Sequence, residues 1–332
     1  MDLTEDQLIA AIARVISNDD AEVRVGVGDD AAVVRSGSGD LVLTTDLLVE
    51  GIHFERDSIS ARDLGSKAIV VNVSDLAAMG ASPRYGLVSV AMPADVETAW
   101  VMELTGGMRD AASEYALALV GGDTNRAAEI VISVAAVGEV APGRAVLRSG
   151  ARPGDLLTVT GELGAAAGGL ALSRADTATT AAALSEPWAR ELLEALARPL
   201  ARVGEGQALA SAGATAMIDL SDGLAKDLSR LCLASGVGAR LELASIPVST
   251  ALAAGAGLLG VDALELAIGG GEDYELLVAL PGDALDVARG ALDGFGVTLT
   301  RVGTIIEGSG VLAVDADGRA APLEAKGWDH FA

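Results

Sequence analysis

Helix-like and strand-like patterns of apolar residues alternate along the chain, which indicates a mixed α and β architecture. Two helix starts carry capping patterns, Thr4 followed by Gln7 and Ser60 followed by Asp63. Helices are predicted in the first half at residues 4–16, 60–79 and 93–116. Short runs of apolar and β-branched residues predict strands at 41–45, 85–91, 118–120 and 130–137. The first of these strands is expected to end at Asp46 and to present polar groups there.

A dense group of helix and strand breakers follows the first half. The stretch 141–155 contains Pro142, Gly143, Gly150, Pro153 and Gly154, which favours a domain junction. Beyond it the chain is Ala-rich and mainly helical up to residue 212, with a poorly constrained surface segment expected at 173–184. Further strands are predicted at 216–220 and 274–280. A chain of 332 residues also suggests two domains, and we place them at 1–140 and 141–332.

Composition narrows the possible partners. The chain has 23 Lys and Arg against 47 Asp and Glu, a formal net charge of −24, which argues against nucleic-acid binding. The same excess of carboxylates is compatible with hard cations such as Mg²⁺. Its one cysteine, Cys232, excludes an intrachain disulfide framework, a Cys-rich zinc site and an iron–sulfur cluster. An acidic N-terminal segment and short apolar runs predict a cytoplasmic protein that does not interact with membranes.

Asp-containing motifs, most of them with Gly, recur in both halves. Each could simply form a turn, since Asp and Gly favour turns. If the fold gathers them, however, like charges about 4 Å apart would repel by ~1 to 4 kcal/mol, and bound cations would offset that repulsion. Oxygen ligands favour Mg²⁺, Mn²⁺ or Ca²⁺ over zinc or copper. The motifs are Gly28-Asp29-Asp30, Thr44-Thr45-Asp46, Asn72-Val73-Ser74-Asp75, Gly121-Gly122-Asp123, Asp219-Leu220-Ser221-Asp222-Gly223 and Gly269-Gly270-Gly271-Glu272-Asp273.

The common nucleotide-binding signatures are missing from the sequence. No Gly-Lys dipeptide occurs, so there is no P-loop, and the only lysines are Lys67, Lys226 and Lys326. The protein-kinase motifs His-Arg-Asp and Asp-Phe-Gly are also missing. Residues 26–28 lack the third glycine of a dinucleotide fingerprint. The remaining interpretation is a nucleotide or phosphate enzyme that uses metals where others use lysines.

These motifs resemble, in order and over nearly the whole chain, those of the thiamine-monophosphate kinase family. That family belongs to the superfamily of aminoimidazole ribonucleotide synthetase and selenophosphate synthetase. The reactive cysteine of selenophosphate synthetases and the terminal cysteine of the hydrogenase maturation member have no counterpart here. One departure is Asn125-Arg126-Ala127, where the family more often has Thr-Arg-Gly. The further matching segments are 44–54, 72–80, 121–124, 149–155, 219–224, 270–276 and 328–331.

The resemblance implies a two-domain α/β (α+β) fold like that of aminoimidazole ribonucleotide synthetase. The N-terminal domain would bind ATP and Mg²⁺, and its sheet would form the interface of a homodimer. The implied reaction is ATP-dependent phosphorylation of thiamine monophosphate to thiamine diphosphate, the last step of thiamine diphosphate biosynthesis. No catalytic base is expected, because a phosphate monoester with a second pKa of about 6 is already largely ionised at neutral pH.

The resemblance also assigns roles residue by residue. Nucleotide contacts correspond to Gly122, Asp123, Arg148 and Ser221, and contacts to thiamine monophosphate correspond to His53, Glu272 and Trp328. Metal ligands correspond to Asp30, Thr44, Thr45, Asp46, Asp75, Asp123, Asp219 and Asp222. Sequence alone does not decide between Asp29 and Asp30, or between Glu272 and Asp273. His53 could be an ordinary half-buried histidine, Arg148 a surface arginine, and Trp328 an anchor for the chain end.

Two other functions remain open from the sequence. One is an ATP-dependent enzyme of the same superfamily that acts on an amide or formyl group. It would be favoured by a tight Gly-rich nucleotide loop and a dedicated lysine in the first half, and the sequence shows neither. The other is a non-enzymatic cation-binding or scaffold protein, which would show no thermal stabilisation by Mg²⁺ and an ATP analogue.

Overall fold

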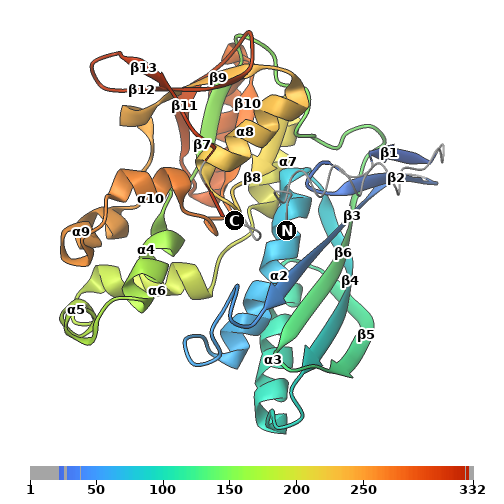
Figure 1. The fold of residues 1–332 in the computed structure, drawn as a ribbon. Helices are drawn as coiled ribbons and strands as arrows, with labels where there is room; N and C mark the ends of the chain where they lie inside the picture. Colours follow the sequence, from blue (N-terminus) through green and yellow to red (C-terminus); the bar gives the residue numbers. More distant parts are fainter. Residues whose placement is uncertain (1–21, 26–27, 38, 326, 329–332) are drawn as a thin grey trace, which may run out of the picture.

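The fold is built on two β-sheets, one from each half of the chain (Figure 1). This computed structural model describes residues 22–25, 28–37, 39–325 and 327–328, so the helix predicted at 4–16 lies outside the described residues. The first sheet has six strands in the order β1-β2-β3-β6-β4-β5. They are β1 (Val23–Val25), β2 (Ala32–Ser36), β3 (Gly39–Val49), β4 (Ser82–Met92), β5 (Ala118–Arg126) and β6 (Val131–Val140).

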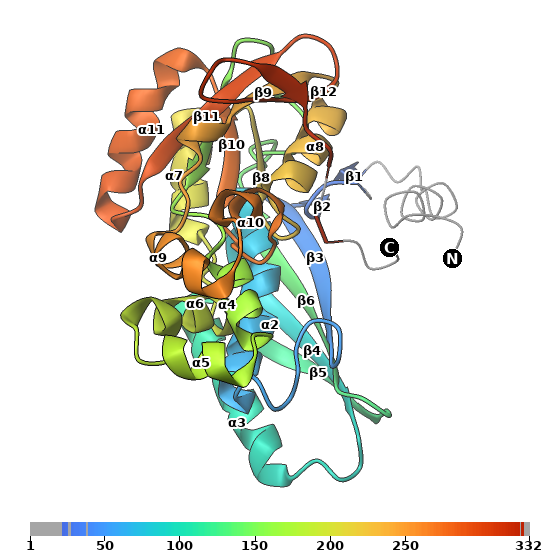
Figure 2. The ribbon, with the colours of Figure 1, turned by 60° about the vertical axis from the view of Figure 1, so that its left-hand side comes forward.

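Two long helices, α2 (Ala61–Ala78) and α3 (Thr98–Glu114), cover one face of the first sheet (Figure 2). Ser60 caps α2 by accepting a hydrogen bond from the Asp63 backbone N–H, as the sequence predicts. The helices approach closely at two glycines. A Cβ on Gly65 would lie 2.0 Å from the Leu104 carbonyl oxygen, and one on Gly107 would lie 1.8 Å from that of Arg62. This tight contact fixes α2, the helix that carries Asp75.

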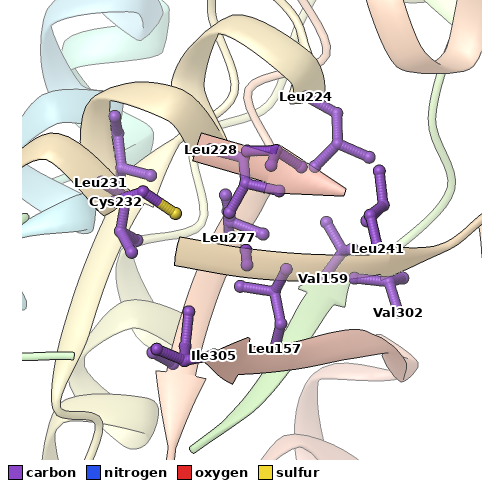
Figure 3. Packing of buried hydrophobic residues seen from close by; sticks show 14 of the residues in the cluster. Leu157, Val159, Leu224, Leu228, Leu231, Cys232, Leu241, Leu277, Val302 and Ile305 are labelled. Atoms are coloured by element: carbon purple, nitrogen blue, oxygen red, sulfur yellow. The ribbon is translucent and has the colours of Figure 1, made fainter. Parts of the chain in front are cut away.

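The second sheet has seven strands in the order β13-β12-β9-β11-β7-β10-β8. Helix α8 (Leu224–Ser235) packs Leu228, Leu231 and Cys232 onto one face of this sheet (Figure 3). Strand β10 is buried on both faces, because Leu277 lies in this cluster and Leu276 and Val278 lie in a second one. The strands are β7 (Leu156–Thr160), β8 (Ala216–Asp219), β9 (Gly238–Glu242), β10 (Leu276–Leu280), β11 (Leu299–Ile306), β12 (Gly310–Val314) and β13 (Ala320–Pro322).

The other helices of the second half lie on the second sheet or beside it (Figure 1). They are α4 (Ala165–Ser173), α5 (Thr177–Ala183), α6 (Pro187–Ala197), α7 (Val203–Ala212), α9 (Thr250–Leu259), α10 (Ala263–Gly269) and α11 (Leu285–Leu292). The segment 173–184 is mostly exposed, as expected, but it is not poorly constrained, because Asp176 caps α5 through the backbone N–H groups of Ala178 and Thr179. Among the described residues, none of the helices combines the length and the apolar character needed to cross a bilayer.

Several predicted element ends are also wrong. Strand β3 does not end near Asp46 but continues to Val49, because its antiparallel ladder with β6 runs without interruption. Strand β5 continues through Gly121-Gly122-Asp123 to Arg126, since it pairs in parallel with β4 along this length. Helix α3 begins at Thr98 and not at Pro93. Two Asp motifs therefore lie within strands, where successive side chains point to opposite faces.

Candidate active site

Three carboxylates from distant parts of the chain meet between the two sheets. Asp30 precedes β2, Asp75 lies on α2, and Asp219 ends β8. One carboxylate oxygen of each lies within 4.8 Å of the others. The fold therefore does gather Asp motifs, as the cation hypothesis requires. We call these three residues the acid cluster.

The acid cluster is costly to assemble without a counter-charge. Burial, followed by repulsion from Asp46, Asp219 and Asp30, raises the pKa of Asp75 well above its usual value. Burial and the charge of Asp30 raise the pKa of Asp219 in the same way. Two hydroxyls partly compensate. The Thr44 Oγ1 donates to Asp75 Oδ2 at 2.5 Å, and the Ser74 Oγ donates to Asp219 Oδ2 at 2.6 Å.

The arrangement around Asp30 fits a cation. Arg148 Nη2 donates to Asp30 Oδ1 at 2.7 Å, so Arg148 is a partner of the acid cluster and not a plain surface residue. The second oxygen, Asp30 Oδ2, is buried without a hydrogen-bond partner in the described part of the chain. A buried, unpaired carboxylate oxygen beside two further carboxylates suits Mg²⁺, which prefers oxygen ligands.

Asp29 and Asp30 have different environments. Asp29 is turned toward the backbone, and its carboxylate accepts the Arg148 N–H at 3.1 Å and 3.2 Å. Burial, and then the neighbouring charge of Asp30, raise the pKa of Asp29 to about 6. Only Asp30 belongs to the acid cluster. This geometry favours Asp30 as the ligand and Asp29 as a support for the Arg148 backbone.

The strand motif 44–46 is divided between the two faces of the first sheet. Thr44 reaches the acid cluster, and the charge of Asp46 is felt by Asp75, while the Asp46 backbone N–H donates to Asn72 Oδ1 at 2.8 Å. Thr45 points the other way, and its hydroxyl lies 3.4 Å from that of Ser133 on β6. Thr45 is thus separated from the other metal candidates of its strand.

Asp123 lies on the same face of the first sheet as Thr45, and we call this face the outer face. The β4–β5 register pairs Ser89 with Asp123, and both line a recess of about 110 Å³ with Ser133. Its neighbour Gly122 packs against β4, where a Cβ would lie 1.8 Å from the Val88 carbonyl oxygen. Apart from Asp222, the metal candidates therefore fall into two groups, one at or beside the acid cluster and one on the exposed face of the first sheet.

The other site candidates of the second half converge on the Ser221–Asp222 loop. The Glu272 N–H donates to the Ser221 carbonyl at 2.8 Å, and the Trp328 N–H donates to the Asp222 carbonyl at 3.2 Å. The Asp222 carboxylate forms ion pairs with Lys226 at 3.0 Å and Arg230 at 2.7 Å, so it lies outside the acid cluster. Two predicted substrate residues, Glu272 and Trp328, are thus held by adjacent carbonyl groups.

Glu272 and Asp273 also differ clearly. The Asp273 carboxylate accepts the Gly164 N–H at 2.8 Å and 3.0 Å, at the start of α4. Burial raises the pKa of Asp273 to about 8. Glu272 instead has a partly exposed side chain that pairs with Lys67 Nζ at 2.8 Å. The geometry favours Glu272 over Asp273 for a contact with a ligand.

His53 lies in the turn that follows β3. Its Nδ1 accepts the Val49 backbone N–H at 3.0 Å, which places the proton of a neutral imidazole on Nε2. The side chain is half-buried and its neighbour Phe54 is buried, which also fits an ordinary half-buried histidine with no contact to substrate. The orientation nevertheless gives Nε2 the capacity to donate to an anionic group.

Sequence reasoning missed two contributors to this region. The Ser74 hydroxyl holds Asp219, although its motif, Asn72-Val73-Ser74-Asp75, points to Asp75 alone. Lys67 pairs with Glu272, although nothing in the surrounding sequence distinguishes it from the other two lysines. Lys67 lies seven positions before Ser74, about two helical turns, so both side chains lie on the same face of α2. The helical repeat of 3.6 residues is the sequence signal that places the two residues on one face.

Comparisons with known proteins identify the family to which the chain belongs. The family model for AIR synthase related protein, N-terminal domain, matches residues 28–140, and that for the C-terminal domain matches residues 152–315. Thiamine-monophosphate kinase of Escherichia coli K12 is 40% identical over 332 residues, covering 99% of this chain and 98% of that protein. The Bacillus subtilis enzyme of the same name is 33% identical, covering 94% of each chain.

Solved structures agree with these sequence matches. A structure of AaThiL complexed with AMPPCP and TMP has a TM-score of 0.85 and 35% identity, covering 100% of this chain and 99% of that one. E. coli HypE, a hydrogenase maturation protein, shares the fold with a TM-score of 0.70 at 23% identity, covering 96% of this chain and 97% of that one. The two-domain fold expected from the resemblance is therefore confirmed, and the chain belongs to the thiamine-monophosphate kinase family of AIR synthase related proteins.

Proposed function

We propose that the chain transfers the γ-phosphoryl group of ATP to thiamine monophosphate in the cytoplasm, giving thiamine diphosphate and ADP. The observation that carries the proposal is the acid cluster, with its unpaired Asp30 oxygen and its Arg148 partner. Curated relatives bear the corresponding name, and the AaThiL structure contains both an ATP analogue and TMP. Phosphoryl transfer between two anions needs positioning and cations more than a base.

We assign the metal-binding role to two groups of residues. Asp30, Thr44, Asp46, Asp75 and Asp219 would hold Mg²⁺ at the acid cluster, while Thr45 and Asp123 would do so on the outer face of the sheet. Asp222 would contribute from the adjoining loop if a bound cation displaces one of its ion pairs. When bound, Mg²⁺ supplies charge neutralisation for the phosphate oxygens during transfer.

The chain's own residues would bind and orient the two substrates. We assign nucleotide contacts to Gly122, Asp123, Arg148 and Ser221, in agreement with the sequence resemblance. The planar guanidinium of Arg148 suits a phosphate group, and its Nε is buried without a partner among the described residues.

Contacts to thiamine monophosphate are assigned to His53, Glu272 and Trp328. The Nε2–H of His53 would donate to the phosphate group of thiamine monophosphate. The carboxylate of Glu272 would accept a hydrogen bond from the thiamine moiety. The Trp328 side chain is 42% exposed beside the Asp222 loop, where it could stack on the cationic thiazolium ring.

A coupled ADP-release assay tests the reaction most directly. ADP should appear with Mg²⁺, ATP and thiamine monophosphate, and not with thiamine or an aminoimidazole precursor in its place. Release with the aminoimidazole precursor alone would favour the amide or formyl alternative. No release with any acceptor, together with no thermal shift by Mg²⁺ and AMPPCP, would favour the scaffold alternative.

We also propose that two chains join through the outer face of the first sheet. Leu47, Tyr85 and Leu87 are each about half exposed, at 48%, 49% and 50%, and share this face with Asp123. Exposed apolar patches of this kind favour an isologous interface. Leu87→Glu should convert a dimer to a monomer in sedimentation velocity. Leu233→Glu, on the surface of α8, is the matched control and should leave the dimer intact.

The domain boundary at residue 140/141 is part of the same proposal. Strand β6 ends at Val140 and β7 begins at Leu156, and the connection between them contains no helix or strand. Residues 1–140 would then supply the dimer contact and most metal ligands, and residues 141–332 would supply Arg148, Glu272 and Trp328. Limited proteolysis within 141–155 should yield two fragments that stay associated.

A further inference from the structure

A buried lysine holds the carboxylate of Glu272. Lys67 lies on α2 and is only 2% exposed. Its Nζ lies 2.8 Å from Glu272 Oε1 and 2.9 Å from Oε2, and it also donates to the Leu196 carbonyl at 3.2 Å. One ammonium group therefore joins the first half of the chain to two separate elements of the second half.

Lys67 lies on a face of α2 whose side chains bind acidic groups of the second half. Ser74 lies seven residues further on, which is about two helical turns or ~10 Å along the same face. Ser74 donates to Asp219 at 2.6 Å, and Lys67 pairs with Glu272. The same rigid helix thus sets the position of one acid-cluster residue and of one candidate substrate residue.

The loop that carries Glu272 is strained and closely packed. Glu272 and Tyr274 have positive φ values of 68° and 50°, which non-glycine residues rarely adopt. A Cβ on Gly271 would lie 2.4 Å from the Ser221 carbonyl oxygen. Such a conformation persists only where its surroundings enforce it, and the pair with Lys67 is one of the contacts that do so.

We propose that Lys67 is a positioning residue that presents the Glu272 carboxylate to thiamine monophosphate; this rests on the proposed function. The side chain of Glu272 is 27% exposed, so one side of it remains accessible while the other is held by the buried ammonium. Without Lys67, the carboxylate would gain hydration by turning to solvent, away from its partner in the substrate complex. Lys67 acts through Glu272 and does not itself contact the reacting atoms.

The test compares Lys67→Met with Glu272→Gln and the double variant. Lys67→Met should raise KM for thiamine monophosphate about tenfold, as expected for loss of a charge-assisted contact, while KM for ATP changes less than about twofold. Adding Glu272→Gln to Lys67→Met should have little further effect, because both changes remove one interaction. Lys67→Arg keeps the positive charge, so its KM for thiamine monophosphate should lie between those of the wild type and Lys67→Met. If Lys67→Met does not fold, Lys67→Arg is the variant that tests the proposal.

A matched control separates positioning from stability. Arg202→Met removes the half-buried cation that pairs at 2.5 Å with Glu275, which lies three positions after Glu272. It should lower the thermal unfolding midpoint without raising KM for thiamine monophosphate. An equal rise of KM in both variants, or a wild-type KM in both Lys67→Met and Lys67→Arg, would overturn the role of Lys67. Failure of the wild-type protein to phosphorylate thiamine monophosphate would instead overturn the proposed function.

Discussion

Arg148 and Asp30 form an ion pair of 2.7 Å in which only one carboxylate oxygen is used. The side chain of Asp30 is fully buried and that of Arg148 is 20% exposed, so the guanidinium is the principal counter-charge of Asp30. The other oxygen of this acid-cluster residue, Asp30 Oδ2, is buried without a partner among the described residues. The pair therefore leaves one coordinating position ready for a cation.

The first prediction concerns that counter-charge. Arg148→Met should lower the free energy of unfolding of the metal-free protein by about 3 kcal/mol, because it leaves a buried carboxylate unpaired. Mg²⁺ should restore part of the loss, and thermal unfolding with and without Mg²⁺ measures this. Arg24→Met is the matched control, since Arg24 pairs at 2.6 Å with the equally buried Asp40. An equal response of both variants to Mg²⁺ would contradict the prediction.

The second prediction contrasts the two groups of metal candidates. Asp75→Asn and Asp123→Asn should each lower turnover by about 100-fold or more, ~3 kcal/mol of barrier, because an amide binds Mg²⁺ more weakly than a carboxylate. In the metal-free protein, Asp75→Asn should raise the unfolding midpoint, because it removes the cost of burying a carboxyl group whose pKa burial and neighbouring charges raise. Asp123→Asn, on an exposed strand, should leave it unchanged. If either variant keeps wild-type turnover at limiting Mg²⁺, the substituted residue is not a metal ligand.

The sequence predicted which residue types would gather, but not all of their supports. The recurrence of Asp motifs along the chain predicts bound cations if the fold gathers these motifs, and Asp30, Asp75 and Asp219 are the residues that it gathers. The hydrogen bond from Ser74 and the ion pair of Lys67 join residues 145 and 205 positions apart. Such contacts depend on how the two sheets pack, which local periodicity does not encode.

Element ends were harder to predict for a related reason. Thr44-Thr45-Asp46 was expected at a strand end, since polar residues there disrupt an apolar run. The continuous ladder between β3 and β6 overrides that local signal and extends the strand to Val49. Because the motif lies within the strand, Thr44 and Thr45 point to opposite faces, a division that sequence analysis did not make.

The third prediction is a pH dependence that arises from Asp273. Its pKa is raised by burial to about 8, so between about pH 4 and pH 8 the folded chain holds a proton that the unfolded chain has lost. The unfolding free energy contributed by this group must therefore fall as pH rises through that window. Asp273→Asn should flatten the decline, measured by urea unfolding of the metal-free protein at pH 5 and pH 8.

The control for Asp273 is an acid whose pKa moves the other way. Hydrogen bonds from the start of α5 lower the pKa of Asp176, so its stabilising contribution is complete at both pH values. Asp176→Ala should lower the unfolding free energy equally at pH 5 and pH 8, because the N-cap of α5 is lost. A slope that Asp273→Asn leaves unchanged would show that Asp273 is ionised in the folded chain over this range.

The last prediction concerns the Trp328 side chain. Trp328 is joined to the Asp222 loop through its backbone, because its N–H donates to the Asp222 carbonyl and its own carbonyl accepts from Lys226 Nζ. Trp328→Ala keeps both contacts, so the unfolding midpoint should change little. If the indole stacks on the thiazolium ring, KM for thiamine monophosphate should rise several-fold, ~0.5 to 2 kcal/mol, while KM for ATP stays the same. Trp328→Phe should retain part of the affinity, since a smaller aromatic face still attracts a cation. If Trp328→Ala leaves both KM values unchanged, or lowers stability enough to account for the kinetic effect, the side chain serves only to anchor the segment.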